Sequence, residues 1–193
     1  MLFSEVFNLS KDILNENDIL DVSLDFDTPL FIDPLLIFNN ENKEIKSWYE
    51  DINNFILYIF QQKQDDCPFE SVEHILQYFK KEIRNNWLGL SVFLNKGKAM
   101  DRKNIYDFYE NIKKIKNNDI SQSNHIEKIN FFQDGVGVDK ISDVTTRLIY
   151  HNLLTFTEKF ATKYLNKSQV SIFNISGAFF DRDLGMFINK KYW

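Results

Sequence analysis

The chain has 193 residues, the size of one ordinary globular domain, and a hydrophobic fraction of 44% that can build a core. Its net charge of −5 excludes coating of nucleic acid by overall basicity, and its single cysteine excludes an intramolecular disulfide. The start carries Glu5 and resembles no signal peptide, and the apolar run FILYIF at 55–60 is too short to span a bilayer. We therefore expect one soluble cytoplasmic domain, residues 1–193, without membrane association.

The first half of the chain predicts a strand followed by helices. Alternating apolar residues predict a half-buried strand over 19–26, then a Thr-Pro bend and a short extended piece at 30–33. Apolar residues at helical spacing predict helices over 44–63 and, from Pro68, over about 69–83.

The second half predicts further helices and a hairpin region. A short strand running into a glycine-containing loop is expected at 86–98, a helix over about 102–117, and the longest helix over about 142–165. In the tail, hairpin turns are expected at 176–177 and at 181–185. This order predicts an α+β fold in which a small mixed or antiparallel sheet packs against several amphipathic helices. The strand at 20–26 is expected to be central, with the longest helix packed across it.

The first candidate site is the acidic stretch DFDTPLFIDP. Asp25 and Asp27 lie two residues apart on the predicted strand, so their side chains point the same way, and Asp33 follows the bend. Grouped carboxylates are ligands for a hard cation such as Mg²⁺ or Mn²⁺. The alternative is structural: Asp25 is solvated, Asp27 caps the turn, and Asp33 begins a turn before a proline.

The same stretch suggests a minor alternative. LDFDTPL is similar to the Asp-x-Asp-x-Thr motif of haloacid-dehalogenase-type phosphatases, although Pro29 stands where that family has threonine. The helical block that follows also lacks the strand–helix–strand alternation of that family.

The second candidate site is the stretch FFQDGVGVDKISD. Gly135 and Gly137 permit unusual backbone conformations, and Ser142 or Asp139 is expected to cap the long helix, whose amino end favours an anion. Asp139 and Asp143 lie four residues apart and share a face if the helix begins early. The structural alternative is that Asp143, in the first turn, only balances the helix dipole.

Other common catalytic patterns are missing. None of His74, His125 and His151 has a partner at metal-ligand spacing, so each is expected to be a surface or core-edge residue. The glycines near Lys98 do not form a phosphate-binding P-loop, and there is no nucleophile elbow.

Three stretches, at 25–36, 87–100 and 135–149, resemble the ordered blocks of a poorly characterised bacterial family found near mobile-element and defence-type genes. The first carries DTPLFIDP and the third GxGxDxISD, whereas the middle one departs at Ala99, where a further glycine is expected. The resemblance implies a defence-type protein, and by association a nuclease. It also implies that longer members continue beyond the tail with another strand.

We therefore expect a metal-dependent nuclease or phosphodiesterase. The expected roles are carboxylates around one cleft, ligands of Mg²⁺ or Mn²⁺, and groups that contact a nucleic-acid phosphate through a local basic patch. The catalytic carboxylates would be Asp27, Asp33, Asp139 and Asp143; the metal ligands Asp25, Asp27 and Asp139; and the substrate contacts Gly135, Gly137, Lys98, Lys140 and Ser142.

The competing hypothesis is a non-catalytic subunit of a multi-protein antiviral or toxin-type complex, or a homo-oligomer. In that case the aspartates are caps and turn residues, and some of the 19 phenylalanines form an exposed interface. The two hypotheses differ in whether the acidic stretches meet in space, which the distance between the Asp27 and Asp139 carboxylates would measure.

Overall fold

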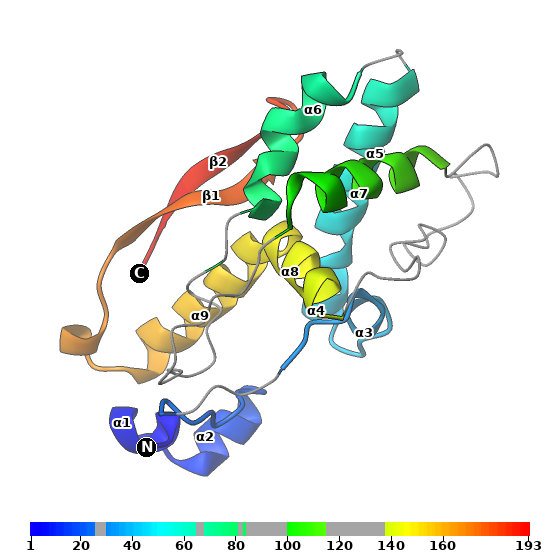
Figure 1. The fold of residues 1–193 in the computed structure, drawn as a ribbon. Helices are drawn as coiled ribbons and strands as arrows, with labels where there is room; N and C mark the ends of the chain where they lie inside the picture. The colour runs from blue at the N-terminus through cyan, green and yellow to red at the C-terminus, as the bar shows by residue number, and fades with distance from the viewer. Residues whose placement is uncertain (26–29, 65–67, 81–82, 84–99, 115–137) are drawn as a thin grey trace.

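A computed structural model of the chain describes residues 1–25, 30–64, 68–80, 83, 100–114 and 138–193 (Figure 1). These residues form helices and one two-stranded antiparallel sheet, which confirms the predicted α+β class. The strand and glycine loop expected at 86–98 lie outside the described residues. No helix in the described part of the chain is long and apolar enough to cross a membrane.

The amino-terminal segment forms α1 (Phe3–Phe7) and α2 (Lys11–Glu16) in place of the expected sheet strand. Of the predicted strand, residues 19–25 make only one bridge, between Ser23 and Leu2, and Leu20 is 58% exposed. The Asp21 carboxylate accepts hydrogen bonds from the main-chain N and the Oγ of Ser4, at 2.8 and 2.7 Å, which lower its pKa. The prediction of a central strand was wrong: Asp21 binds the first turn of α1 instead of facing solvent from a sheet.

The next segment forms α3 (Pro34–Phe38), α4 (Lys43–Ser47) and α5 (Tyr49–Gln64). The helix predicted over 44–63 is thus present but broken at Trp48, whose side chain is buried. No strand forms at 30–33. Helix α5 runs through the centre of the fold, and its Phe55 is completely buried.

Two predicted amphipathic helices lie against α5 or its neighbours. The first appears as α6 (Phe69–Leu76) followed by the 3₁₀ turn η1 (Gln77–Lys80), and the second as α7 (Arg102–Lys114). Helix α7 contacts α5, α6 and η1, so its apolar face closes one side of the core.

The longest predicted helix is two helices. α8 (Val138–Leu148) and α9 (Tyr150–Tyr164) meet at Ile149, whose φ of −97° and ψ of 12° end the first helix. The bend gives the two halves different sets of partners: α8 contacts α5, η1 and β1, whereas α9 lies along both strands of the hairpin (Figure 1). A straight helix would leave part of its apolar face uncovered.

After η4 (Lys167–Gln169), the tail forms an antiparallel hairpin of β1 (Phe173–Asp181) and β2 (Met186–Tyr192). The turn predicted at 181–185 is confirmed, but the turn predicted at 176–177 was wrong, because the register shift between Ile175 and Phe179 absorbs Gly177 within β1. Gly177 has a φ of +62°, and a Cβ there would lie 2.4 Å from Cε1 of Tyr78. Glycine is therefore required here for two reasons: the irregular backbone of β1 and the close approach of the Tyr78 ring.

The core joins α5 to the hairpin through aromatic rings. The ring of Phe55 lies 5.4 Å from that of Phe79, 4.9 Å from Phe180 and 6.1 Å from Phe187. The first two pairs are edge-to-face, the geometry that aromatic quadrupoles favour. The sheet that packs on the helical core is therefore the carboxy-terminal hairpin and not a sheet built on residues 19–25.

Candidate functional site

The two acidic stretches meet in the structure. The main-chain N of Ile32 donates a 2.9 Å hydrogen bond to the Oγ of Ser142 on α8. Ser142 is buried, and Ile32 packs against the core. This contact places Asp33, the residue after Ile32, and Asp143, the residue after Ser142, at the same junction between α3 and α8.

The described carboxylates of the first stretch have structural partners. Asp33 is the N-cap of α3: its Oδ1 accepts a 2.8 Å hydrogen bond from the main-chain N of Leu35, while Pro34 occupies the first helical position. The carboxylate of Asp25 pairs with the amino group of Met1 and accepts a hydrogen bond from it. Asp25 is thus engaged by the amino terminus, while Asp27 lies outside the described residues.

Helix α8 begins earlier than the sequence suggested. Because its first residue is Val138, Asp139 and Ser142 lie inside the helix, and the prediction that either of them is its N-cap was wrong. The positions of Asp139 and Asp143 are one turn apart, as expected for an early start. Asp143 is exposed, whereas the side chain of Asp139 is not among those described, and Gly135, Gly137 and Lys98 lie outside the described residues.

A buried cation lies one turn after Asp143. Arg147 is only 5% exposed, and its guanidinium lies 5.6 Å from the ring centre of Tyr150. Burial lowers the pKa of Arg147, and the fields of Tyr150, Tyr78 and Asp143 oppose that shift. Asp143 therefore helps to stabilise a buried positive charge, whatever else it does.

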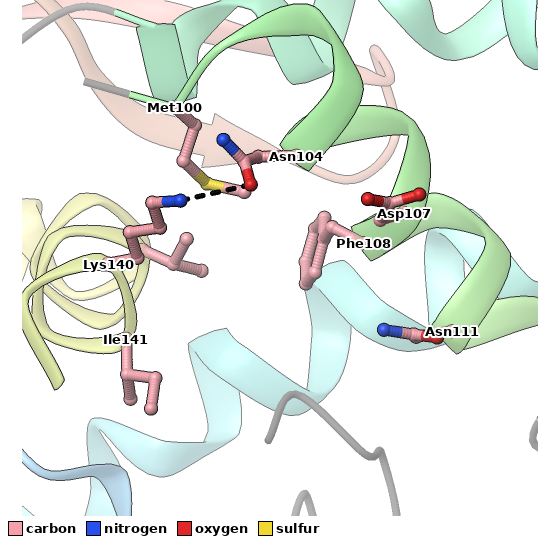
Figure 2. Close-up of a pocket in the computed structure, with 8 residues that line it drawn as sticks. Met100, Asn104, Asp107, Phe108, Asn111, Lys140 and Ile141 are labelled. Atoms are coloured by element: carbon pink, nitrogen blue, oxygen red, sulfur yellow. Dashed lines mark hydrogen bonds between the residues drawn. The ribbon is translucent and has the colours of Figure 1, made fainter. Parts of the chain in front are cut away.

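Lys140 points from α8 into a pocket between α7 and α8 (Figure 2). Its Nζ donates a 3.0 Å hydrogen bond to the Oδ1 of Asn104. The pocket has a volume of about 40 Å³ and combines polar and apolar side chains. Its lining residues are Met100, Asn104, Asp107, Phe108, Asn111, Lys140, Ile141 and Val144.

The described residues alone do not form a cation site. Among them, no group of three histidine, cysteine, aspartate or glutamate side chains could hold a metal ion. Two of the three predicted metal ligands, Asp27 and Asp139, have side chains beyond that part of the structure.

A second polar cluster, between α9 and β2, was missed by the sequence analysis. His151 Nδ1 lies 2.8 Å from the Tyr192 hydroxyl and 3.4 Å from Thr155 Oγ1, and the Lys190 Nζ lies 3.4 Å from His151 Nε2. Since a lysine ammonium only donates, Nε2 must accept, and the neutral ring carries its proton on Nδ1. The signal available in the sequence was the alternation of β2, which puts Lys190 and Tyr192 on one face.

The electrostatics of this cluster favour an uncharged imidazole. Burial lowers the pKa of His151, and the Lys190 ammonium lowers it further, while Glu158 opposes the shift. Burial raises the pKa of Tyr192 to about 12, so its hydroxyl keeps its proton at neutral pH. The cluster thus fixes β2 on α9 and holds a neutral ring beside a cation.

A half-buried carboxylate lies near the same strand. Asp51 on α5 accepts a 2.6 Å hydrogen bond from Asn152 Nδ2 on α9. Burial raises the pKa of Asp51, and the Lys190 charge opposes that shift. This pair ties the central helix to α9 below the hairpin, and we assign it a structural role.

Comparison with known proteins places the chain in a family. A search among curated proteins and a search among solved structures found no match. A family model described as "Domain of unknown function (DUF8370)" matches residues 8–193. Because that match covers nearly the whole chain, the protein belongs to the DUF8370 family.

Proposed function

We propose that this protein is a metal-dependent phosphodiesterase that cleaves nucleic acid, in a bacterial defence setting. The observation that carries the proposal is the hydrogen bond from Ile32 to Ser142, because it brings together two acidic stretches from distant parts of the chain. A shared cleft requires that meeting. Had the stretches lain on opposite sides of the molecule, the proposal would have had no geometric support.

The donor chemistry at the junction suits a hard cation. Asp33 uses Oδ1 to cap α3, and within the described part of the chain its Oδ2 accepts no hydrogen bond. In the proposal, Asp27 and Asp139 complete the set of oxygen ligands, and Asp143 lies one helical turn from Asp139. Mg²⁺ or Mn²⁺ held there would stabilise charge on a phosphate and acidify a bound water.

The contacts of Asp25 argue against it as a metal ligand, and the described residues give no support to the phosphatase alternative. Asp25 already pairs with the amino group of Met1, so we leave it out of the proposed site. A haloacid-dehalogenase-type site needs a strand before its aspartates, and residues 19–25 make only a single bridge. The nuclease proposal needs no such strand.

Cleavage assays with matched variants test the proposal. The purified protein is incubated with single- and double-stranded DNA and RNA, alone and with the products of neighbouring genes, with Mg²⁺, Mn²⁺ or a chelator. We expect metal-dependent cleavage that is lost in Asp27→Asn and in Asp139→Asn and kept in Asp12→Asn, an aspartate on α2. Absence of cleavage in every mixture, together with absence of metal binding by calorimetry, would reject the proposal.

A second candidate function is a binding subunit of a multi-protein complex. It is favoured by exposed apolar side chains that flank Asp33: Leu30 is 45%, Phe31 50% and Leu36 68% exposed. Isolated exposed apolar residues are ordinary, but three within seven residues are typical of an interaction surface. Asp33 and Asp143 would then act only as a cap and as a partner of buried charge.

Light scattering coupled to size exclusion tests this candidate. The protein is measured alone and after co-expression with the neighbouring gene products, for the wild type and for a variant with Leu30, Phe31 and Leu36 all changed to serine. A stable complex or dimer that the triple variant loses, while its melting temperature stays unchanged, supports the subunit function. A monomer under all conditions argues against it.

A further inference from the structure

The pocket between α7 and α8 is lined by a buried asparagine without a hydrogen-bond partner among the described residues. Asn111 is only 6% exposed, lines the pocket and points from α7 into it (Figure 2). Within the described part of the chain, its side chain makes no hydrogen bond. The amide of Asn111 is therefore available to a hydrogen-bonding group that enters the pocket.

The same pocket contains a cation that no described carboxylate neutralises. Lys140 is half-buried, and its one hydrogen bond among the described residues goes to the amide oxygen of Asn104. Asp107 lines the same pocket but is exposed and lies beyond ion-pair distance of Lys140. An ammonium has three N–H donors, so two of those of Lys140 remain for a ligand.

Taken together, the pocket combines hydrogen-bond donors with apolar side chains. Lys140 supplies charge and N–H groups, Asn111 supplies an amide, and Phe108 and Val144 are among the apolar side chains of the lining. A volume of about 40 Å³ holds a few waters or a tetrahedral oxyanion, and it is too small for a nucleobase.

We propose that the α7–α8 pocket binds a phosphate group through Lys140 and Asn111. This rests on the proposed function in one respect, namely that the phosphate belongs to a nucleic-acid backbone. Ser142 meets Ile32 from α8, whereas Lys140, Ile141 and Val144 of α8 line the pocket facing α7. A phosphate in the pocket therefore lies beside the acidic junction and not in it, and it corresponds to a neighbour of the phosphate that is cut.

Two variants separate binding from folding. Lys140→Gln removes the charge and keeps a similar length, and Asn111→Leu removes the amide at similar volume. Because the Asn111 side chain makes no hydrogen bond to another described residue, leucine is expected to leave the melting temperature nearly unchanged. A loss of binding in that variant then cannot come from unfolding. The control is Lys163→Gln, which changes a lysine on α9.

Titration calorimetry in the presence of a chelator measures phosphate binding without cleavage. The ligands are inorganic phosphate, a short single-stranded oligonucleotide and its uncharged methylphosphonate analogue. We expect the oligonucleotide to bind, its uncharged analogue to bind far more weakly, and each pocket variant to lose at least about tenfold in affinity while the control keeps wild-type affinity.

Comparison of the ligands shows whether the bound phosphate belongs to a nucleic acid or is free. Comparison of binding with cleavage tests the pocket and the nuclease proposals separately. Tighter binding of the oligonucleotide than of inorganic phosphate identifies a nucleic-acid backbone, and the reverse order identifies free phosphate as the ligand of the same pocket. Binding that depends on Lys140 and Asn111 in a protein that cleaves nothing keeps the pocket and rejects the nuclease. Absence of binding of both ligands, or equal affinity in wild type and both variants, overturns the pocket proposal whether or not cleavage occurs.

Discussion

Ile32 and Ser142 are joined by a 2.9 Å hydrogen bond although 110 positions separate them in the chain. The donor is a main-chain N–H just before α3, and the acceptor is a buried hydroxyl inside α8. The bond satisfies a main-chain donor that lies two residues before α3 and has no main-chain partner among the described helices and strands. It therefore fixes the register of the first acidic stretch against the second.

Removal of this hydroxyl should destabilise the protein. Ser142→Ala removes the acceptor of the Ile32 N–H at a part-buried site, and we expect the free energy of unfolding to fall by about 1–3 kcal/mol. Urea unfolding followed by circular dichroism measures the change. Thr162→Ala is the control: its hydroxyl bonds the preceding turn of α9 at an exposed site, and its loss should cost less than about 0.5 kcal/mol. Equal costs in the two variants would mean that the junction contributes nothing.

The His151 cluster predicts a pH dependence of stability. The pKa of His151 is lower in the folded protein than its ordinary value of 6.5, so the unfolded chain binds the proton more readily. This contribution to stability is complete above about pH 6.5 and is lost as the pH falls through the lower folded pKa. On protonation, Nε2 can no longer accept from Lys190, and two cations then face each other.

Melting temperatures between pH 7.5 and pH 5 check this sign. The melting temperature of the wild type should fall as the pH is lowered from 7.5 to 5. His151→Asn should show a smaller dependence of melting temperature on pH, because the imidazole with the lowered pKa is gone. His74→Asn, which changes a histidine on α6, should keep the wild-type slope. A wild-type slope in His151→Asn would assign the effect to other groups.

Gly177 should not tolerate a side chain. At a φ of +62°, alanine costs about 1–2 kcal/mol in backbone energy, and its Cβ would also overlap the ring of Tyr78. We expect Gly177→Ala to destabilise the protein by more than the backbone term alone, as measured by chemical denaturation. In a double-mutant cycle with Tyr78→Leu, the clash should appear as a favourable coupling between the two changes. Additive effects would show that the ring moves aside freely.

Phe55 should be the most sensitive position of the aromatic core. It is completely buried and contacts the rings of Phe79, Phe180 and Phe187, so Phe55→Ala should cost about 3–5 kcal/mol. Phe31→Ala is the matched control, since Phe31 is 50% exposed and should cost little. Denaturation midpoints of the two variants compare the same chemical change inside and outside the core.

The sequence predicted the helices better than the sheet. Apolar spacing located α5, α6 and α7 because the period of 3.6 residues persists over several turns. The pattern over 142–165 did not reveal the break at Ile149, since a buried bend keeps apolar residues on both sides of it. The alternation at 19–26 has the period of a strand, but a period does not show whether a neighbouring strand exists.

The candidate site was predictable only in part. The pairing of the two acidic stretches followed from their composition, and the described contact at Ser142 agrees with it. Roles for single residues did not follow, because partners such as Met1 for Asp25 and Lys190 for His151 are distant in sequence. Capping by Asp33 before Pro34 is local, and the sequence already contained it as the structural alternative.

The packing of Phe180 and Phe187 on Phe55 affects the order in which the chain can fold during synthesis. The central helix α5 leaves the ribosome early, but two of the rings that bury Phe55 belong to β1 and β2. The hairpin pairs residues that are close in the chain and forms quickly, whereas its docking on α5 must close a long loop. During translation, α5 therefore exposes part of its aromatic face until the hairpin has emerged, and slower elongation lengthens the interval in which the nascent chain is prone to aggregate.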